Sequence, residues 1–370
     1  MRTLIAGGGT GGHLIPALAV AAELRAADPE GAVLLVGRRG GVAEALVERT
    51  GIPLETLEIR GLDFAHPATV ALFGLRLTRS VREAGRLIRR FRPDVVVGAA
   101  GYVSVPVVLA ARREGVPVLL LEQNALPGRA TRFLARRADA VAVSFPGTAR
   151  LLRGHGVEVT GNPIRREFRD GAPPLRDRPR RLLAWGGSQG ARRINRALSD
   201  CAPRLLRDHP ELEITHQCGQ LDEAEVLATR AALDPELRRR WEVAAFYADA
   251  ATRVSEADLV LMRAGGSSLA EVSALGRPMI LVPYPYAGDH QRHNAAPYVE
   301  AGAALLVPDA ECDGERLRGV LEEVLGDPGR WREMAERSRA MGRPEATANV
   351  AAIVRRLAGT GRARGTPRAA

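Results

Sequence analysis

The chain has 370 residues, with 53 basic against 43 acidic side chains and a formal net charge of +10. Hydrophobic residues make up 46% and charged residues 26%, which excludes a wholly disordered protein, and the length favours two domains over one. The sequence contains no lysine, so every fixed positive charge is a guanidinium group. This charge suits an anionic partner such as a nucleotide, a nucleic acid or a lipid head group.

The three cysteines, Cys201, Cys218 and Cys312, form no C-x-x-C pattern, so the sequence supports neither a disulfide framework nor a zinc site. The first residues lead directly into glycines without the apolar core of a signal peptide. No apolar run reaches the roughly 18 residues of a membrane-spanning helix. We therefore expect a cytosolic chain, with contact to a membrane surface left open.

The first half of the chain alternates short apolar runs with longer amphipathic stretches. Apolar runs without period-two alternation predict parallel strands that are covered on both faces. We place strands at 3–6, 32–36, 95–98, 116–121 and 140–143, and helices at 16–27 and 81–91. The polar, arginine-rich stretch 161–181 contains four prolines, which is typical of a linker.

The same alternation restarts after this stretch. The predicted strands are 182–185, 214–217, 243–246, 259–262, 279–282 and 304–307, and the helices are 191–206, 268–274, 313–325 and 331–341. The predicted fold class is therefore α/β, with two Rossmann-like doubly wound parallel sheets. We set the domains at 1–161 and 162–342, with a helix near 345–358 packing back on the first domain and a disordered tail at 359–370.

A glycine turn at residues 7–13, here called the first glycine turn, follows the first strand and leads into an apolar helix. It satisfies G-x-G-x-x-G at the strand-to-helix position, where backbone N–H groups can bind an anion. A dinucleotide site also needs an acidic residue at the end of the second strand. That strand ends in Arg38 and Arg39, which argues against NAD and leaves NADP open. The alternative is that the glycines only allow the strand and the helix to pack tightly against each other, with no ligand bound.

A second glycine turn at residues 186–191 follows a strand of the second domain and opens a helix. Ligands of such domains bind beyond the carboxyl ends of the strands, so two such turns predict a cleft between the domains. A third turn at 263–268 leads to Glu271, which can accept the vicinal hydroxyls of a ribose or can be an ordinary solvated glutamate. The dense polar loop 283–294 suits a sugar, or is a plain surface loop.

Seven short segments occur in an order that resembles the MurG family, bacterial N-acetylglucosaminyltransferases that make lipid II for peptidoglycan. The resemblance extends over residues 5–355. The segments are GGTGGH at 8–13, GYVS at 101–104, EQN at 122–124, GNPIR at 161–165, GGSQGA at 186–191, RAG at 263–265 and DHQ at 289–291.

The resemblance implies a GT-B fold with two Rossmann-like domains that face a cleft. It also implies transfer of N-acetylglucosamine from UDP-GlcNAc to the C4 hydroxyl of MurNAc in undecaprenyl-pyrophosphoryl-MurNAc-pentapeptide (lipid I), with inversion. UDP-GlcNAc is then a substrate, and no cofactor is expected. The implied partners are lipid I, an anionic membrane surface and other cell-wall enzymes, with no nucleic acid. The implied location is peripheral, on the cytoplasmic face of the bacterial plasma membrane.

The same resemblance assigns roles to individual residues. Donor-binding positions are Thr10, Gly11, Gly12, Asn124, Arg165, Ser188, Gln189, Phe246, Tyr247, Gly266, Ser267, Ser268, Leu269, Ala270, Glu271 and Gln291. Acceptor-binding positions are His13, Tyr102 and Asn124. His13 and Glu122 are the catalytic candidates.

An inverting transfer needs a base for the incoming hydroxyl and stabilisation for the departing diphosphate. The sequence contains no D-x-D, so we expect no metal clamp, and the leaving charge falls on the amides of the second glycine turn and on Arg165. His13 is the first candidate base, because imidazole titrates near neutrality. Glu122 is the rival base, or it orients the imidazole. His13 can instead bind the acceptor pyrophosphate or cap its helix.

The stretch 66–92 combines apolar residues at 68–77 with seven arginines and the single acid Glu83. This composition favours docking on an anionic membrane surface, and a helix packed on the sheet with solvated arginines is the alternative. Three other functions remain open at this stage. They are an NADP-dependent oxidoreductase, a nucleic-acid binder and a GT-B transferase for another UDP-sugar.

Overall fold

The computed structural model describes residues 1–8, 11–40, 44, 47–48, 50–59, 67–153, 156–187, 190–286 and 288–364. Within these ranges the side chains of residues 11, 67–73, 75 and 361–364 are not described. The chain divides into two compact units: unit 1 comprises Met1–Arg165 with Glu345–Ala370, and unit 2 comprises Arg166–Pro344. The sequence had placed these breaks at 161/162 and after 342.

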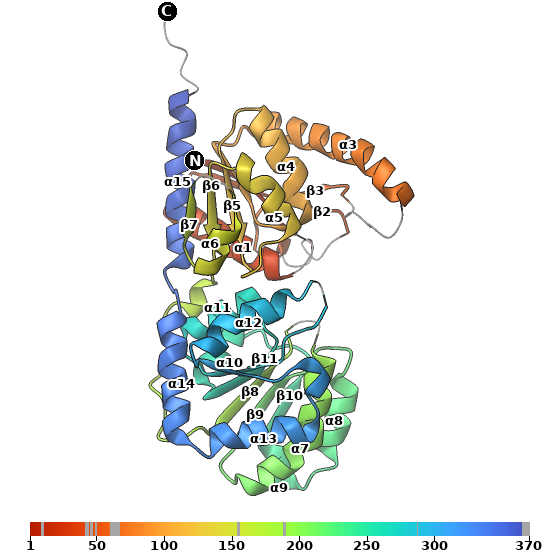
Figure 1. Ribbon diagram of the computed structural model, residues 1–370, viewed down its shortest axis with the longest axis vertical. Helices are drawn as coiled ribbons and strands as arrows, with labels where there is room; N and C mark the ends of the chain where they lie inside the picture. Colours follow the sequence, from red (N-terminus) through yellow and green to blue (C-terminus); the bar gives the residue numbers. More distant parts are fainter. Residues whose placement is uncertain are drawn as a thin grey trace, which may run out of the picture. The chain divides into compact units, whose positions relative to one another are not determined.

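Unit 1 contains a seven-stranded parallel sheet in the order β3-β2-β1-β4-β5-β6-β7 (Figure 1). Its strands are β1 Arg2–Ala6, β2 Ala32–Arg38, β3 Leu54–Leu57, β4 Val95–Gly98, β5 Val118–Glu122, β6 Ala140–Val143 and β7 Val157–Val159. The sequence missed β3 and β7. Both are edge strands in which Glu55 and Glu158 interrupt the apolar run that marks the buried strands.

Helices cover both faces of this sheet. They are α1 Gly11–Ala27, α3 Pro67–Phe91, α4 Gly101–Arg113, α5 Arg129–Leu134, α6 Pro146–Leu151 and α15 Ala346–Arg364, with a 3₁₀ turn at Ala135–Arg137. One apolar cluster joins the sheet to α1 and α15, for example through Leu14 and Val354. A second cluster joins the opposite face to α3 and α4, for example through Ile88 and Val107. The sheet is therefore the middle layer of three.

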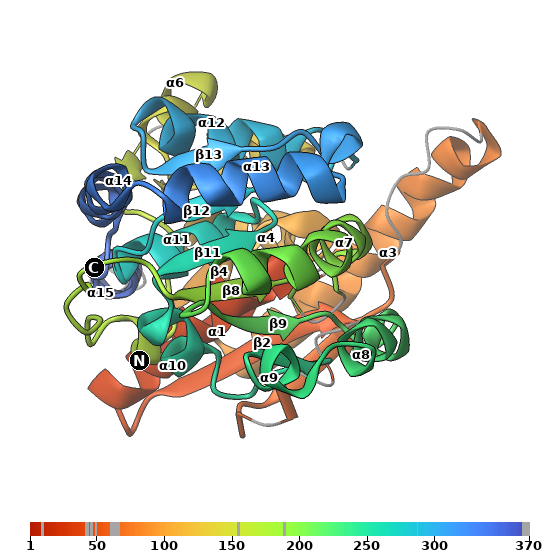
Figure 2. The same ribbon diagram turned by 90° about the horizontal axis from the view of Figure 1, so that it is seen from below.

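Three helix boundaries of unit 1 differ by several residues from those expected. The helix expected at 16–27 begins at Gly11, with Pro16 inside it, so the last residues of the first glycine turn belong to its first turn. The helix expected at 81–91 begins at Pro67 and extends beyond the rest of its unit (Figure 2). The tail expected to be disordered from 359 is helical as far as Arg364, since α15 continues through Gly359 and Gly361 in spite of their low helix propensity. Residues 365–370 lie outside the described part.

Unit 2 repeats the architecture with a six-stranded parallel sheet in the order β10-β9-β8-β11-β12-β13. Its strands are β8 Arg181–Trp185, β9 Glu213–Gln217, β10 Trp241–Ala244, β11 Leu259–Met262, β12 Met279–Leu281 and β13 Ala304–Leu306. Its helices are α7 Arg192–Asp208, α8 Glu223–Ala231, α9 Pro235–Arg239, α10 Ala250–Glu256, α11 Gly266–Ala274, α12 His290–Glu300, α13 Gly314–Leu325 and α14 Pro328–Met341, with 3₁₀ turns at Arg166–Phe168 and Asp309–Glu311. The large core cluster includes fully buried Trp241 and Trp331, and all three cysteines are buried in this unit.

The strand expected at 243–246 begins and ends earlier, at Trp241–Ala244. Trp241 is fully buried and pairs with Ile214 of β9, so the strand starts where the apolar packing starts. Phe246 and Tyr247 therefore follow the strand, at the edge of the sheet where ligands of such folds bind.

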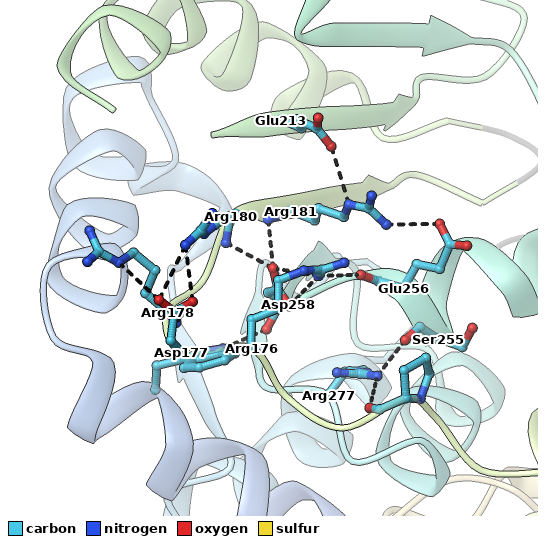
Figure 3. A network of polar contacts seen from close by, with 12 residues as sticks. Arg176, Asp177, Arg178, Arg180, Arg181, Glu213, Ser255, Glu256, Asp258 and Arg277 are labelled. Atoms are coloured by element: carbon cyan, nitrogen blue, oxygen red, sulfur yellow. Dashed lines mark hydrogen bonds and ion pairs between the residues drawn. The ribbon is translucent and has the colours of Figure 1, made fainter. Parts of the chain in front are cut away.

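The stretch 166–180, expected to be a linker, is bound to unit 2. Figure 3 shows Arg176, Arg180 and Arg181 gathered around Asp258. The buried Asp258 carboxylate accepts from Arg176 Nη1 at 2.9 Å and from the backbone N–H of Arg180 and Arg181, each at 2.9 Å. The Arg277 guanidinium donates to Pro173 O at 2.9 Å. These hydrogen bonds hold the irregular segment on unit 2 and give the buried Asp258 carboxylate the partners that a buried charge requires.

Candidate active site

The candidate residues of unit 1 follow four adjacent strands of one parallel sheet. Residue Ala6 of β1 pairs with Val36 of β2 and with Gly98 of β4, and β5 pairs with β4 on its other side. The first glycine turn, Tyr102, Asn124 and the Arg38–Arg39 pair therefore share the carboxyl edge of the sheet. The strand order reverses between β1 and β4, which is where such sheets bind ligands.

Two backbone turns meet closely at this edge. A β-carbon on Gly101 would lie 2.6 Å from Gly8 O and 3.6 Å from His13 Nδ1, and Gly101 has φ +76°. The preceding Ala100 has φ +59°, an unfavourable conformation for a residue other than glycine. Ser104 Oγ stabilises the turn by donating to Ala100 O at 2.8 Å. Strained backbone of this kind is typical of functional sites.

The other candidates of unit 1 have different surroundings. His13 is half-buried in the first turn of α1, and Tyr102 is exposed in the first turn of α4. Gly12 is exposed next to His13 in the first turn of α1, whereas Thr10 lies outside the described residues and only the backbone of Gly11 is described. Arg165 is half-buried at the end of the first segment of unit 1.

Glu122 is buried, and its carboxylate is held by the turn that follows β5. Oε1 accepts from Asn124 N at 3.0 Å and from Asn124 Nδ2 at 3.2 Å, and Oε2 accepts from Gly128 N at 3.0 Å. Both oxygens are therefore engaged with donors of residues 124–128. This arrangement suits a carboxylate that shapes the turn and places Asn124 better than one that removes a proton from a substrate.

In unit 2 the second glycine turn follows β8, beside the point where the strand order reverses between β8 and β11. Gly187 and Gly190 have φ +69° and +74°. A β-carbon on Gly190 would lie 2.2 Å from Cys218 O, so only glycine fits against the end of β9. The N-terminus of α7 follows directly, which suits an anion. Ser188 and Gln189 lie outside the described residues.

A buried polar cluster, which the sequence analysis did not identify, supports this turn. Asn195 Nδ2 donates to Cys218 O and to Asp222 Oδ2, each at 2.8 Å, and Asn195 Oδ1 lies 3.0 Å from His216 Nε2. Arg192 Nε donates to Asp222 Oδ1 at 3.1 Å. Burial lowers the pKa of His216 to about 4, so the ring is neutral and donates from Nε2.

The third turn lies between β11 and α11 and is held by side chains of α12. Gln291 Oε1 accepts from Ala264 N at 3.1 Å and from Tyr284 N at 2.9 Å. Asn294 Nδ2 donates to Ala264 O at 3.3 Å. The amide nitrogen of Gln291 donates to no residue in the part of the chain that the structure describes. The amide nitrogen is therefore the atom of the Gln291 side chain that can bind a ligand.

The remaining donor candidates differ in exposure. Gly266, Ser268 and Ala270 are half-buried along α11, whereas Ser267 and Glu271 are buried. Leu269 is fully buried in the core and its N–H donates to Gly265 O at 2.9 Å, so neither group faces a ligand.

Two aromatic residues follow β10. Phe246 is 55% exposed, whereas Tyr247 is buried and its N–H donates to Gln217 Oε1 at 3.1 Å. Of this pair, Phe246 is thus the one open to a ligand. Among the described residues, no three side chains of the types His, Cys, Asp and Glu gather as a metal site would require. No described helix has both the length and the hydropathy needed to cross a bilayer.

Comparisons with known proteins find matches over nearly the whole chain. The glycosyltransferase family 28 N-terminal domain matches residues 3–143, and the family 28 C-terminal domain matches residues 181–350. Two curated relatives are named UDP-N-acetylglucosamine--N-acetylmuramyl-(pentapeptide) pyrophosphoryl-undecaprenol N-acetylglucosamine transferase. The protein of Pelobacter propionicus is 37% identical, covering 94% of this chain and 97% of its own, and that of Desulforudis audaxviator is 38% identical, covering 98% and 100%.

Among solved structures, MurG of Acinetobacter baumannii superposes with a TM-score of 0.77 at 31% identity, covering 96% of this chain and 99% of its own. The predicted α/β class, with two Rossmann-like domains of the GT-B type, is thereby confirmed. The chain therefore belongs to glycosyltransferase family 28 and, within it, to the MurG family.

Proposed function

We propose that the protein transfers N-acetylglucosamine from UDP-GlcNAc to the C4 hydroxyl of MurNAc in undecaprenyl-pyrophosphoryl-MurNAc-pentapeptide, with inversion at the anomeric carbon. The observation that carries the proposal is a glycine turn opening a helix at the switch point of each parallel sheet, in a chain of this family. Such turns are backbone-amide sites for phosphate groups. A shared cleft between the two units is part of the proposal.

Unit 2 binds the donor in this proposal. The amides of the second glycine turn and the N-terminus of α7 take the diphosphate, together with Arg165, which ends the first segment of unit 1. Glu271 and its neighbours in α11 take the nucleoside, together with the exposed Phe246. Gln291 directs its amide nitrogen to a sugar hydroxyl, because its oxygen is already bonded to two backbone N–H groups.

Unit 1 binds the acceptor near His13, Tyr102 and Asn124. His13 takes the proton of the C4 hydroxyl while the oxygen forms a bond to the anomeric carbon. The bond from that carbon to the diphosphate oxygen breaks, and UDP leaves with the electron pair. We assign the base to His13 because both oxygens of Glu122 accept backbone or amide hydrogen bonds. Glu122 then acts by placing Asn124.

We further propose that α3 docks the protein on an anionic membrane surface, on the cytoplasmic side where UDP-sugars are available. Six arginines of this helix are exposed, and two of them, Arg89 and Arg90, form ion pairs with Glu114 and Glu55. Residues 61–66 and the side chains of 67–73 lie outside the description. Binding to vesicles should rise with anionic lipid and fall with salt, and binding that salt leaves unchanged would contradict docking.

The direct test of function is turnover of UDP-GlcNAc with a soluble lipid I analogue, with and without EDTA. We expect release of UDP and formation of the disaccharide product in both conditions. Stabilisation of the fold by UDP and UDP-GlcNAc, with none by NADPH or an oligonucleotide, would support this reading over an oxidoreductase or a nucleic-acid binder. Turnover of another UDP-sugar in preference to UDP-GlcNAc would contradict the proposed donor.

A further inference from the structure

A pocket of about 520 Å³ lies in unit 1 between α3, α4 and the ends of β2 and β3. Two of its wall residues, Tyr102 and Arg39, belong to the carboxyl edge of the sheet, where the acceptor candidates lie. A ligand bound near Tyr102 could therefore extend a side group into the pocket. Its volume is in the range of pockets that hold a ligand of many atoms, and it far exceeds that of one phosphate group.

The charge of the pocket comes from four arginines, Arg39, Arg76, Arg79 and Arg86. No guanidinium group of these four makes a hydrogen bond or an ion pair with any described residue. This differs from Arg89 and Arg90 on the same helix, which have carboxylate partners. Four arginines of one pocket that have no partner among the described residues repel one another, and an anionic ligand would relieve that repulsion.

The other walls favour a peptide over a purely anionic group. Glu58 and Glu83 line the same pocket, and they would repel a phosphate but accept the N–H groups of a peptide. Leu77, Val105 and Tyr102 add apolar surface that suits short side chains. A peptide combines N–H donors, small apolar groups and a terminal carboxylate, and this combination matches the walls.

We propose that this pocket binds the carboxylate-bearing peptide of the acceptor, so that the enzyme reads the peptide as well as the sugar. The inference rests on the proposed function, in which the acceptor carries a pentapeptide. Arg79 and Arg86, two turns apart on one face of α3, bind carboxylate oxygens, and Glu58 and Glu83 bind peptide N–H groups. The pocket thereby determines acceptor specificity without touching the reacting atoms.

The experiment compares two soluble acceptor analogues that share the sugar, the pyrophosphate and a short lipid, one with the pentapeptide and one without it. The variants are Arg79→Gln and Arg86→Gln. The matched control is Arg82→Gln, which removes an exposed arginine of the same helix that does not line the pocket. Both KM and kcat are measured for each acceptor at saturating UDP-GlcNAc, together with binding to vesicles that contain anionic lipid.

We expect each pocket variant to raise KM for the pentapeptide acceptor about tenfold, the effect of one charge-assisted hydrogen bond, and to leave kcat unchanged. KM for the acceptor without peptide should stay at the wild-type value, and Arg82→Gln should match wild type with both acceptors. Amidation of the peptide carboxylates should raise KM for wild type and not for the pocket variants.

Three results would overturn the inference. An equal rise in KM with both acceptors would mean that the pocket serves the sugar or the pyrophosphate. A loss of vesicle binding in Arg79→Gln and Arg86→Gln that exceeds the loss in Arg82→Gln, without any change in KM, would assign the pocket to a lipid head group. If both variants keep the wild-type KM values and wild-type vesicle binding, the pocket binds neither the acceptor nor a lipid head group. If wild type turns over neither acceptor, the proposed function itself fails.

Discussion

Oε2 of Glu122 lies 3.0 Å from the backbone nitrogen of Gly128, so one carboxylate spans the turn that begins at the end of β5. Its other oxygen accepts two hydrogen bonds from Asn124. The buried charge is thus matched by three donors, and the shape of the turn depends on both oxygens being acceptors.

This relationship predicts the effect of Glu122→Gln. The amide nitrogen of glutamine cannot accept, so it would face at least one N–H donor, and we expect the free energy of unfolding to fall by about 1–3 kcal/mol. Turnover should fall together with stability, while the pH profile keeps its shape. A loss of turnover at full stability, with one limb of the pH profile removed, would instead identify Glu122 as the base. Glu114→Gln, which removes an acid from a surface ion pair, is the control.

Two glycines of the second glycine turn form a matched pair. Both have positive φ, but a β-carbon on Gly187 would meet nothing within 4 Å, whereas one on Gly190 would lie 2.2 Å from Cys218 O. Gly187→Ala should therefore cost about 1–2 kcal/mol of stability from backbone strain alone. Gly190→Ala should cost more and should weaken UDP binding at least tenfold, because the turn must move away from β9. Calorimetry on both variants, with and without UDP, checks this, and equal effects would contradict it.

Gln291 is predicted to have two separable tasks. Gln291→Glu keeps an oxygen that accepts from Ala264 and Tyr284 but lacks the amide nitrogen, so KM for UDP-GlcNAc should rise about tenfold while inhibition by UDP stays the same. Gln291→Leu removes both groups, so the third turn loses its support and UDP should bind more weakly as well. Should the two variants behave alike, the oxygen and the nitrogen have no separate roles.

The buried His216 predicts a pH dependence of stability. Burial lowers its pKa to about 4 in the folded protein, from 6.5 in the unfolded chain. Between these values the unfolded chain binds a proton that the folded chain does not, so stability rises with pH across this window and is lost as the pH falls. The loss should approach about 2–3 kcal/mol near pH 4.

The variant His216→Gln isolates this contribution, because its amide can still donate to Asn195 Oδ1 while it does not titrate. Unfolding by urea at several values between pH 4 and pH 7 should show a smaller slope for the variant than for wild type. His293→Gln, at an exposed histidine of α12, is the control and should retain the wild-type slope, since His216 is still present. Parallel curves for wild type and His216→Gln would contradict the prediction.

The sequence was informative where one short segment determines the structure. The buried strands, such as β4 and β11, are unbroken apolar runs, and the glycine turns follow them at fixed spacing. Edge strands were missed because Glu55 and Glu158 remove that pattern. The support of the turns could not be read from the sequence, because Asn195, His216 and Asp222 come together only when α7, β9 and the following loop pack. The arginine pocket likewise combines separate segments, so the sequence analysis related the arginines of 66–92 to a membrane surface and did not predict a pocket.

Trp185 ends β8 directly before the second glycine turn, and its ring is stacked on Phe168 with the centroids 6.4 Å apart. The other two tryptophans, Trp241 and Trp331, also belong to unit 2. Intrinsic fluorescence excited at the indole band therefore comes from the half that we assign to the donor, and Trp185 is the emitter nearest the predicted diphosphate. A titration with UDP should therefore change the tryptophan emission directly. An acceptor that binds only unit 1 should leave the emission unchanged unless its binding also alters unit 2.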